Sequence, residues 1–131
     1  MKLKESTITI EVPAGDDHDI RTIRLSGVFS EWLFASKFWV KINMRCGTIF
    51  DQYEEDEACE DVVGVIYAEL AKRIQDLTGK VGEIEFVHGW DANGVPLTAR
   101  INSLDLIRQI EEFRDFLEIA LKFHVGAYMS L

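Results

Sequence analysis

Hydrophobic and polar residues alternate with a period of two near the start of this 131-residue chain. In "STITIEV", Ile8, Ile10 and Val12 share one face, while threonine and glutamate share the other. That pattern is typical of a half-buried strand. The following segment "PAGDDHD" is rich in residues that favour turns. The next segment, "IRTIRLSGVF", predicts a second strand.

An aromatic segment follows these strands. In "EWLFASKFWVKIN", two apolar runs flank a short polar break, and we interpret the segment as a β-hairpin. On its second arm, a period of two places Trp39 on the face opposite to Phe38 and Ile42. An exposed tryptophan is a typical anchor for a partner. Trp39 is therefore a candidate binding residue, unless the tail or a partner covers that face. "TIFDQY" predicts one more strand.

Two later segments repeat apolar residues at steps of three and four, which predicts two amphipathic helices. The first begins near Cys59 and ends near Gly79, because glycine commonly terminates helices. The second runs from about Ser103 to Phe123, with Asn102 or Ser103 as its N-cap. The expected buried stripes are Val62, Val63, Ile66, Leu70, Ile74 and Leu77 in the first helix and Leu106, Ile110, Phe113, Leu117 and Leu121 in the second.

The remaining segments complete the expected fold. "EIEFVH" alternates like a strand, and Asn93-Gly94 is a strong signal for a hairpin turn. The apolar tail "HVGAYMSL" is expected to pack on the domain or on a second subunit. The order β-β-β-β-α-β-β-α predicts an α+β fold, in which two helices pack on one face of an antiparallel sheet of about five or six strands. Without a repeat or linker, residues 1–131 are expected to form one domain.

Charge and composition narrow the possible partners. The formal net charge is −9, and residues 46–131 alone carry −10. Such a surface repels phosphate backbones and anionic lipid, so we expect no direct binding to nucleic acid or membranes. The segment "MKLKESTITIEV" does not resemble a secretory signal, which predicts a cytoplasmic protein. In that compartment Cys46 and Cys59 are expected to be free thiols.

The most unusual segment runs from Asp51 to Asp61, which holds seven carboxylates and no Lys or Arg. A calcium loop requires acids at alternate positions and glycine at the sixth, but here Tyr53 is third and Asp56 is sixth. Closely spaced zinc ligands are also lacking. We therefore predict no metal site and no cofactor.

A helix start explains only some of these charges. Glu57, Glu60 and Asp61 near a helix N-terminus favour the helix dipole. The mutual repulsion of all seven costs stability, so a docking surface for a basic partner is the better explanation. The predicted binding residues are Asp51, Glu54, Glu55, Asp56, Glu57, Glu60 and Asp61, together with Trp39.

Catalytic candidates are few. "HGWDANG" places His88, Trp90 and Asp91 at the end of a strand beside a turn, where functional residues often gather. His88 and Asp91 are weak catalytic candidates, because no paired nucleophile or base accompanies them. The alternative interpretation is that His88 packs on the sheet with Ile84 and Phe86.

Three functional hypotheses follow. The leading one is a small acidic cytosolic protein that docks on a basic, nucleic-acid-handling partner, as an inhibitor or an immunity protein for a nuclease toxin does. The second is an enzyme or small-ligand binder with a pocket near His88, Trp90 and Asp91. The third is a subunit of a larger assembly, joined through Trp39 or the C-terminal tail.

Overall fold

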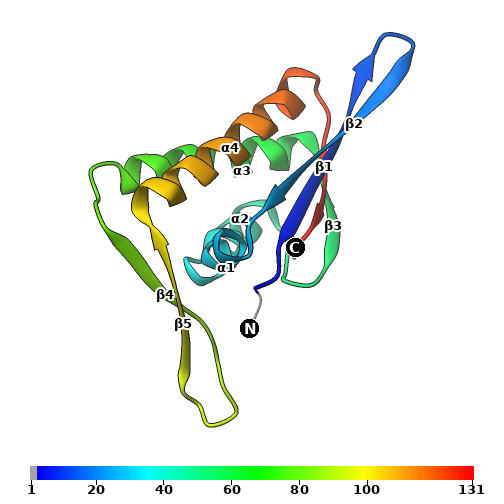
Figure 1. The fold of residues 1–131 in the computed structure, drawn as a ribbon. Coiled ribbons are helices and arrows are strands. Elements are labelled where there is room, and N and C mark those ends of the chain that lie inside the picture. The colour runs from blue at the N-terminus through cyan, green and yellow to red at the C-terminus, as the bar shows by residue number, and fades with distance from the viewer. Residues whose placement is uncertain (1–2) are drawn as a thin grey trace.

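A computed structural model describes residues 3–131 and shows an α+β fold (Figure 1). Within these residues, six strands form two antiparallel sheets, accompanied by four helices. In chain order the elements are β1 (Ser6–Ala14), β2 (Asp17–Leu25), α1 (Gly27–Ala35), α2 (Phe38–Cys46), β3 (Glu55–Ala58), α3 (Glu60–Leu77), β4 (Glu83–Trp90), β5 (Pro96–Asn102), α4 (Ser103–Lys122) and β6 (Ala127–Ser130). The fold class, the antiparallel pairing and the two long helices are confirmed, whereas a single sheet with only two helices was wrong.

The larger sheet has the strand order β2-β1-β6-β3, so the last strand of the chain lies inside it. Met129 of β6 pairs with Ile8 of β1 and with Asp56 of β3. The apolar tail therefore packs within the sheet of its own domain, which was one of the two expected locations; the other was a second subunit. Strand β3 forms an edge, and its only strand partner among residues 3–131 is β6.

The four helices lie on one side of this sheet (Figure 1). Helix α3 packs along α4, α2 contacts α3, and α1 contacts the β4–β5 hairpin. Phe113 of α4 is fully buried and meets the ring of Phe29 from α1 edge to face, with 6.4 Å between the ring centroids. The β1–β2 and β4–β5 hairpins project from this body in opposite directions (Figure 1).

The aromatic segment is helical, so the predicted hairpin was wrong. Helices α1 and α2 meet at Lys37, which adopts a left-handed conformation with φ 63°. On α1, Phe29, Trp32 and Leu33 have helical spacing and are all buried. Trp39 of α2 is only 2% exposed. The expectation of an exposed Trp39 was therefore also wrong, because a helix turns Trp39 toward the same core that receives Phe38.

The segment Thr48–Tyr53 was predicted as a strand, but it is a loop, and the strand forms later as β3. The side chain of Asn43 shapes the loop. Its Nδ2 donates to the carbonyl of Phe50 at 2.9 Å, and its Oδ1 accepts from the backbone N–H of Phe50 at 2.9 Å. These bonds hold the buried Phe50 without a strand partner.

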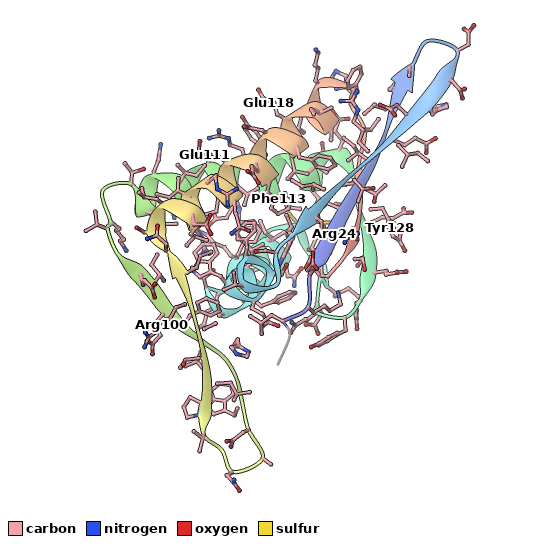
Figure 2. All side chains as sticks on the ribbon, in the orientation of Figure 1. Arg24, Arg100, Glu111, Phe113, Glu118 and Tyr128 are labelled. Carbon is pink, nitrogen blue, oxygen red and sulfur yellow. The ribbon has the colours of Figure 1, made fainter. Side chains whose placement is uncertain are left out.

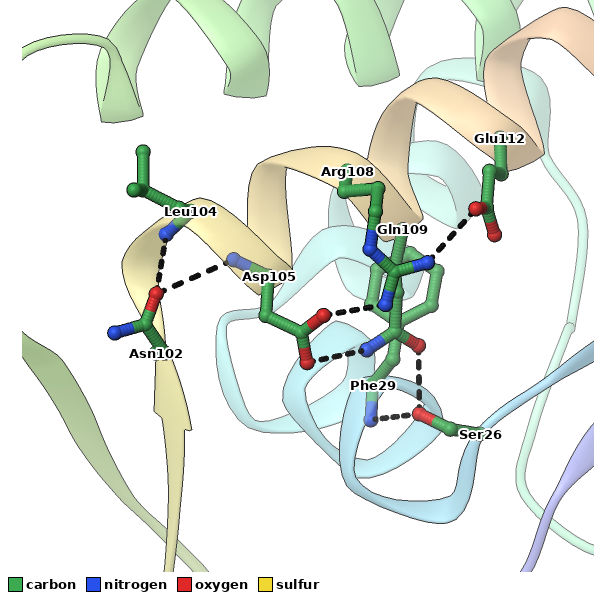
Figure 3. A network of polar contacts seen from close by, with 8 residues as sticks. All are labelled: Ser26, Phe29, Asn102, Leu104, Asp105, Arg108, Gln109 and Glu112. Atoms are coloured by element: carbon green, nitrogen blue, oxygen red, sulfur yellow. Dashed lines mark hydrogen bonds and ion pairs between the residues drawn. The ribbon is translucent and has the colours of Figure 1, made fainter.

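Side chains cap the starts of α1 and α4, and the cap of α4 is the predicted one. Asn102 caps α4, because its side chain accepts hydrogen bonds from the backbone N–H groups of Leu104 and Asp105 (Figure 3). The Ser26 hydroxyl accepts from the N–H of Phe29 at the start of α1 and donates to Gln109 of α4 at 2.7 Å (Figure 3). The cap of α1 is thereby also a tertiary contact to α4.

A buried ion cluster joins three helices. Glu69 of α3 is 2% exposed, and its Oε1 lies 3.1 Å from Nε of Arg73 and 3.2 Å from Nζ of Lys41 on α2. Arg73 also donates to the Ser36 hydroxyl at the end of α1 at 2.8 Å. Burial favours the neutral acid, but the bonds from Arg73 and Lys41 outweigh it and lower the pKa of Glu69.

Within residues 3–131, none of the helices combines the length and the apolar character needed to cross a membrane.

We expect Glu69→Gln to lower the free energy of unfolding by about 3 kcal/mol at pH 7, because Arg73 loses its buried partner. The folded pKa of Glu69 lies below its ordinary value of 4.5. The carboxylate therefore stabilises the fold fully above that pH and loses its effect as the pH falls through the folded value. Urea unfolding of both proteins at pH 7 and pH 3 should show a gap that narrows in acid. An equal gap at both values would contradict this account.

Gly126 begins the approach of β6 to β3, and a Cβ there would overlap the carbonyl oxygen of Ala58. We expect Gly126→Ala to cost about 1–3 kcal/mol of stability. Gly64, inside α3, is a matched control, because an added Cβ would have Leu121 as its neighbour at an ordinary 4.0 Å. Gly64→Ala should instead stabilise the protein by about 1 kcal/mol through helix propensity. Thermal melts of both variants test the contrast, and similar shifts in Tm would refute it.

Candidate functional site: an acidic sheet edge and a neighbouring pocket

The acidic segment 51–61 spans a loop, an edge strand and a helix start. Its carboxylates divide into Asp51 and Glu54 in the loop, Glu55, Asp56 and Glu57 in β3, and Glu60 and Asp61 in the first turn of α3. Most are exposed, and Asp56 and Glu60 are half-buried. The sequence thus placed Glu60 and Asp61 correctly at a helix N-terminus, but Glu57 belongs to the strand.

The register of β3 sends two of these carboxylates to the outer face of the sheet. Glu57 pairs with Tyr128 of β6, and Glu55 lies two residues earlier on the same face. Tyr128 donates its hydroxyl to Glu55 at 2.6 Å. That hydrogen bond, aided by desolvation, raises the pKa of Tyr128. Tyr128 lies on the side of the sheet away from the helices (Figure 2).

The carboxylates have few cationic partners. Glu60 lies 2.7 Å from Nδ1 of His124. Asp51 and Asp56 each accept a hydrogen bond from the next backbone N–H in the chain. Among residues 3–131, no Lys or Arg nitrogen lies within 4.0 Å of any of the seven carboxylates. This edge therefore carries negative charge that the described chain leaves uncompensated.

A shallow groove of about 510 Å³ crosses the outer face of the sheet beside this edge. Glu57 lines it from β3 and Glu11 lines it from β1, while Tyr128 and Ile20 contribute apolar surface. Ile20 is 68% exposed. The acidic edge therefore continues into a concave surface that has carboxylates from two strands.

The three residues of "HGWDANG" do not converge. Asp91 is a turn residue: its Oδ1 accepts from the N–H groups of Asn93 at 2.8 Å and Val95 at 2.9 Å. It does not line the pocket reached by His88 and Trp90. The weak catalytic assignment of Asp91 therefore has a structural alternative, the closure of the β4–β5 turn.

His88 occupies an irregular position in β4. Val87 pairs with Thr98 and Gly89 pairs with Leu97, so His88 is the extra residue of a β-bulge. It lines a pocket of about 320 Å³ with Trp90. The other residues around this pocket include Lys4, Glu31, Gln52 and Tyr53.

Sequence reasoning missed Glu31. It lies on α1 and is only 6% exposed, although glutamate is almost never buried without a partner. Gln52 donates its side-chain amide to Oε1 of Glu31. Glu31 is the one acid within the apolar and aromatic segment that forms α1, and this could have marked it as a candidate. Because we interpreted part of that segment as a β-strand, we did not consider which residues share a helical face with Glu31.

Both cysteines are free thiols, Cys46 half-buried and Cys59 exposed. Within residues 3–131, no cluster of three or more acidic, histidine or cysteine side chains is arranged to hold a metal ion.

Comparisons of the chain with protein-family models, with curated proteins and with solved structures found no match.

Proposed function

We propose that this protein binds a basic protein partner through the acidic sheet edge formed by residues 51–61. The observation that carries the proposal is the concentration of seven carboxylates at one edge, without a Lys or Arg within 4.0 Å among residues 3–131. Like charges held close together repel one another and cost stability. A partner with a positive surface removes that repulsion and gains electrostatic attraction in the same step.

The kind of partner follows from charge complementarity. Proteins that handle nucleic acids carry basic surfaces made for phosphate, and a row of carboxylates presents a similar series of negative charges. An inhibitor of this kind, such as an immunity protein for a nuclease toxin, fits the size and acidity of the chain. The free thiols of Cys46 and Cys59 suit a reducing, cytoplasmic location.

The position of the charges on an edge strand supports docking. The outward-facing backbone groups of β3 have no strand partner among residues 3–131. Unprotected edges tend to pair with other copies of the same protein, and charged side chains suppress that pairing. Glu55 and Glu57 would therefore discourage self-association while leaving the edge open to a basic partner.

A second candidate function is small-ligand binding at the pocket of His88 and Trp90. The observation that favours it is the nearly buried Glu31, which lines the same pocket. The third hypothesis, a subunit of a larger assembly, cannot use the buried Trp39 as its contact, whereas Tyr128 of β6 remains exposed on the outer face of the sheet.

The docking proposal is tested by reversing two charges. Glu54 and Glu57 are exposed, and neither side chain has a hydrogen-bond or ion-pair partner among residues 3–131. Asp56, by contrast, holds the N–H of Glu57 at 2.8 Å and is a poorer choice. We expect Glu54→Lys with Glu57→Lys to weaken partner binding by roughly tenfold or more at low salt, with little change in Tm.

The partner is first captured on the immobilised wild-type protein from an extract of the encoding organism, and its association rate is then measured. Wild-type association should slow steeply between about 50 and 500 mM salt, as the Debye length falls below ~5 Å. The matched control is Glu83→Lys with Glu118→Lys, which changes net charge equally at two other exposed positions. If both double variants associate equally fast at low salt, total charge rather than this edge governs binding, and the proposal fails.

A further inference from the structure

The pocket beside the β4–β5 hairpin contains an acid that lacks a counter-ion. Glu31 is 6% exposed, and its hydrogen-bond donor is the neutral amide of Gln52. Among residues 3–131, no Lys, Arg or His nitrogen lies within 4.0 Å of its carboxylate. A buried carboxylate is costly unless a cation or several donors compensate it. Glu31 is therefore a buried acid of the pocket whose only side-chain donor among residues 3–131 is a neutral amide.

The lysine that lines this pocket, Lys4, already has other partners. Lys4 Nζ donates to the carbonyl of Leu131 at 2.7 Å and lies 5.8 Å from the centroid of the Tyr53 ring. Lys4 thus anchors Leu131, the residue after β6, and forms no ion pair with Glu31. At this distance the Lys4 ammonium and the Tyr53 ring are within the range of a cation–π contact.

Two exposed aromatic side chains line the same pocket. Trp90 is 67% exposed and Tyr53 is 73% exposed, and Tyr53 keeps a left-handed backbone with φ 65°. Large aromatics usually bury most of their surface, so their exposure around one hollow is unusual. The faces of indole and phenol rings attract organic cations, and tryptophan does so most strongly.

The β-bulge at His88 contributes to this arrangement. It shifts the alternation of β4, so that Gly89 pairs with Leu97 and Trp90 pairs with Pro96. His88, Gly89 and Trp90 all line the pocket, and the Trp90 side chain is exposed. Bulges of this kind commonly redirect side chains beside functional sites.

We infer that this pocket binds an organic cation, an ammonium or guanidinium group, with Glu31 as counter-ion and with Trp90 and Tyr53 as aromatic walls. Metal ions of the calcium type require several oxygen ligands, whereas one carboxylate with two aromatic rings suits an organic cation. This site goes beyond the proposed protein docking, because its ligand is one cationic group rather than a basic surface.

The test uses the indole N–H resonance of Trp90 in the 131-residue chain. Trp90 is the exposed tryptophan, since Trp32 and Trp39 are buried. The probes are choline and methylguanidinium as free cations, and Nα-acetyl-lysinamide and Nα-acetyl-argininamide as models of protein side chains. We expect a saturable shift in the millimolar range with cationic probes. The neutral isostere of choline, 3,3-dimethylbutan-1-ol, should cause none, with sodium chloride used to match ionic strength.

The variants separate the carboxylate from general charge effects. Glu31→Gln should weaken cation binding at least tenfold, whereas Glu83→Gln, an exposed acid of the same hairpin, should leave binding unchanged. If Glu31→Gln fails to fold, Trp90→Ala provides the test of cation binding. Binding to this variant is followed through the side-chain amide resonance of Gln52. Because Trp90 is exposed, its loss should spare the fold and remove binding.

Binding of choline or methylguanidinium alone would identify a free small cation, and binding of the amino-acid amides as well would identify a side chain of a partner. Three outcomes would overturn the inference: no saturable shift with any cationic probe, an equal response to the neutral alcohol, or unchanged affinity in Glu31→Gln or Trp90→Ala. The charge-reversal variant at Glu54 and Glu57 leaves Glu31 intact, so failure of protein docking and failure of this site are distinguishable.

Discussion

The insertion of the last strand between β1 and β3 is the constraint on which the rest of the structure depends. Strand β3 has four residues, and β6 is its only strand partner among residues 3–131. The backbone N–H of Leu131 extends this pairing to the carbonyl of Glu54 at 3.0 Å. Lys4 then fixes the carbonyl of Leu131 from the other end of the chain. Strand β3 is therefore held in place by residues that lie 69 to 75 positions later in the sequence.

Carboxylates fill three different physical roles in this fold. Glu69 is buried and compensated by Arg73 and Lys41, which ties three helices together. The acids of the edge are largely exposed, so water screens their repulsion while their field still acts on a partner. Glu31 is buried with a single neutral donor. The degree of compensation, rather than residue type, distinguishes a structural acid from one available for binding.

The sequence predicted the elements that local patterns determine. The stripe of α4 and its Asn102 cap are clear, because twenty residues repeat the helical period and the cap chemistry is specific. The aromatic segment failed, since each of its helices has nine residues and a short run fits either period. The aromatic and β-branched residues of this segment favoured a strand prediction. In the folded protein the segment is helical, and Trp39 packs against Phe38 and Phe50.

The site was predictable only in part, for a related reason. The concentration of seven acids within the eleven residues 51–61 can be recognised directly from the sequence. Their placement on a sheet edge depends on the pairing of β3 with β6, which no local pattern specifies. The pocket depends on helical placement of Glu31 and on the bulge at His88. Both arise from tertiary contacts between segments far apart in sequence.

Hydrogen exchange of the backbone amides, with and without the captured partner at low salt, tests the central claim most directly. If the acidic edge is the docking surface, amides of residues 54–61 should exchange more slowly in the complex, and this protection should disappear at high salt. Unchanged exchange at residues 54–61, together with protection elsewhere such as the β4–β5 turn, would contradict the account.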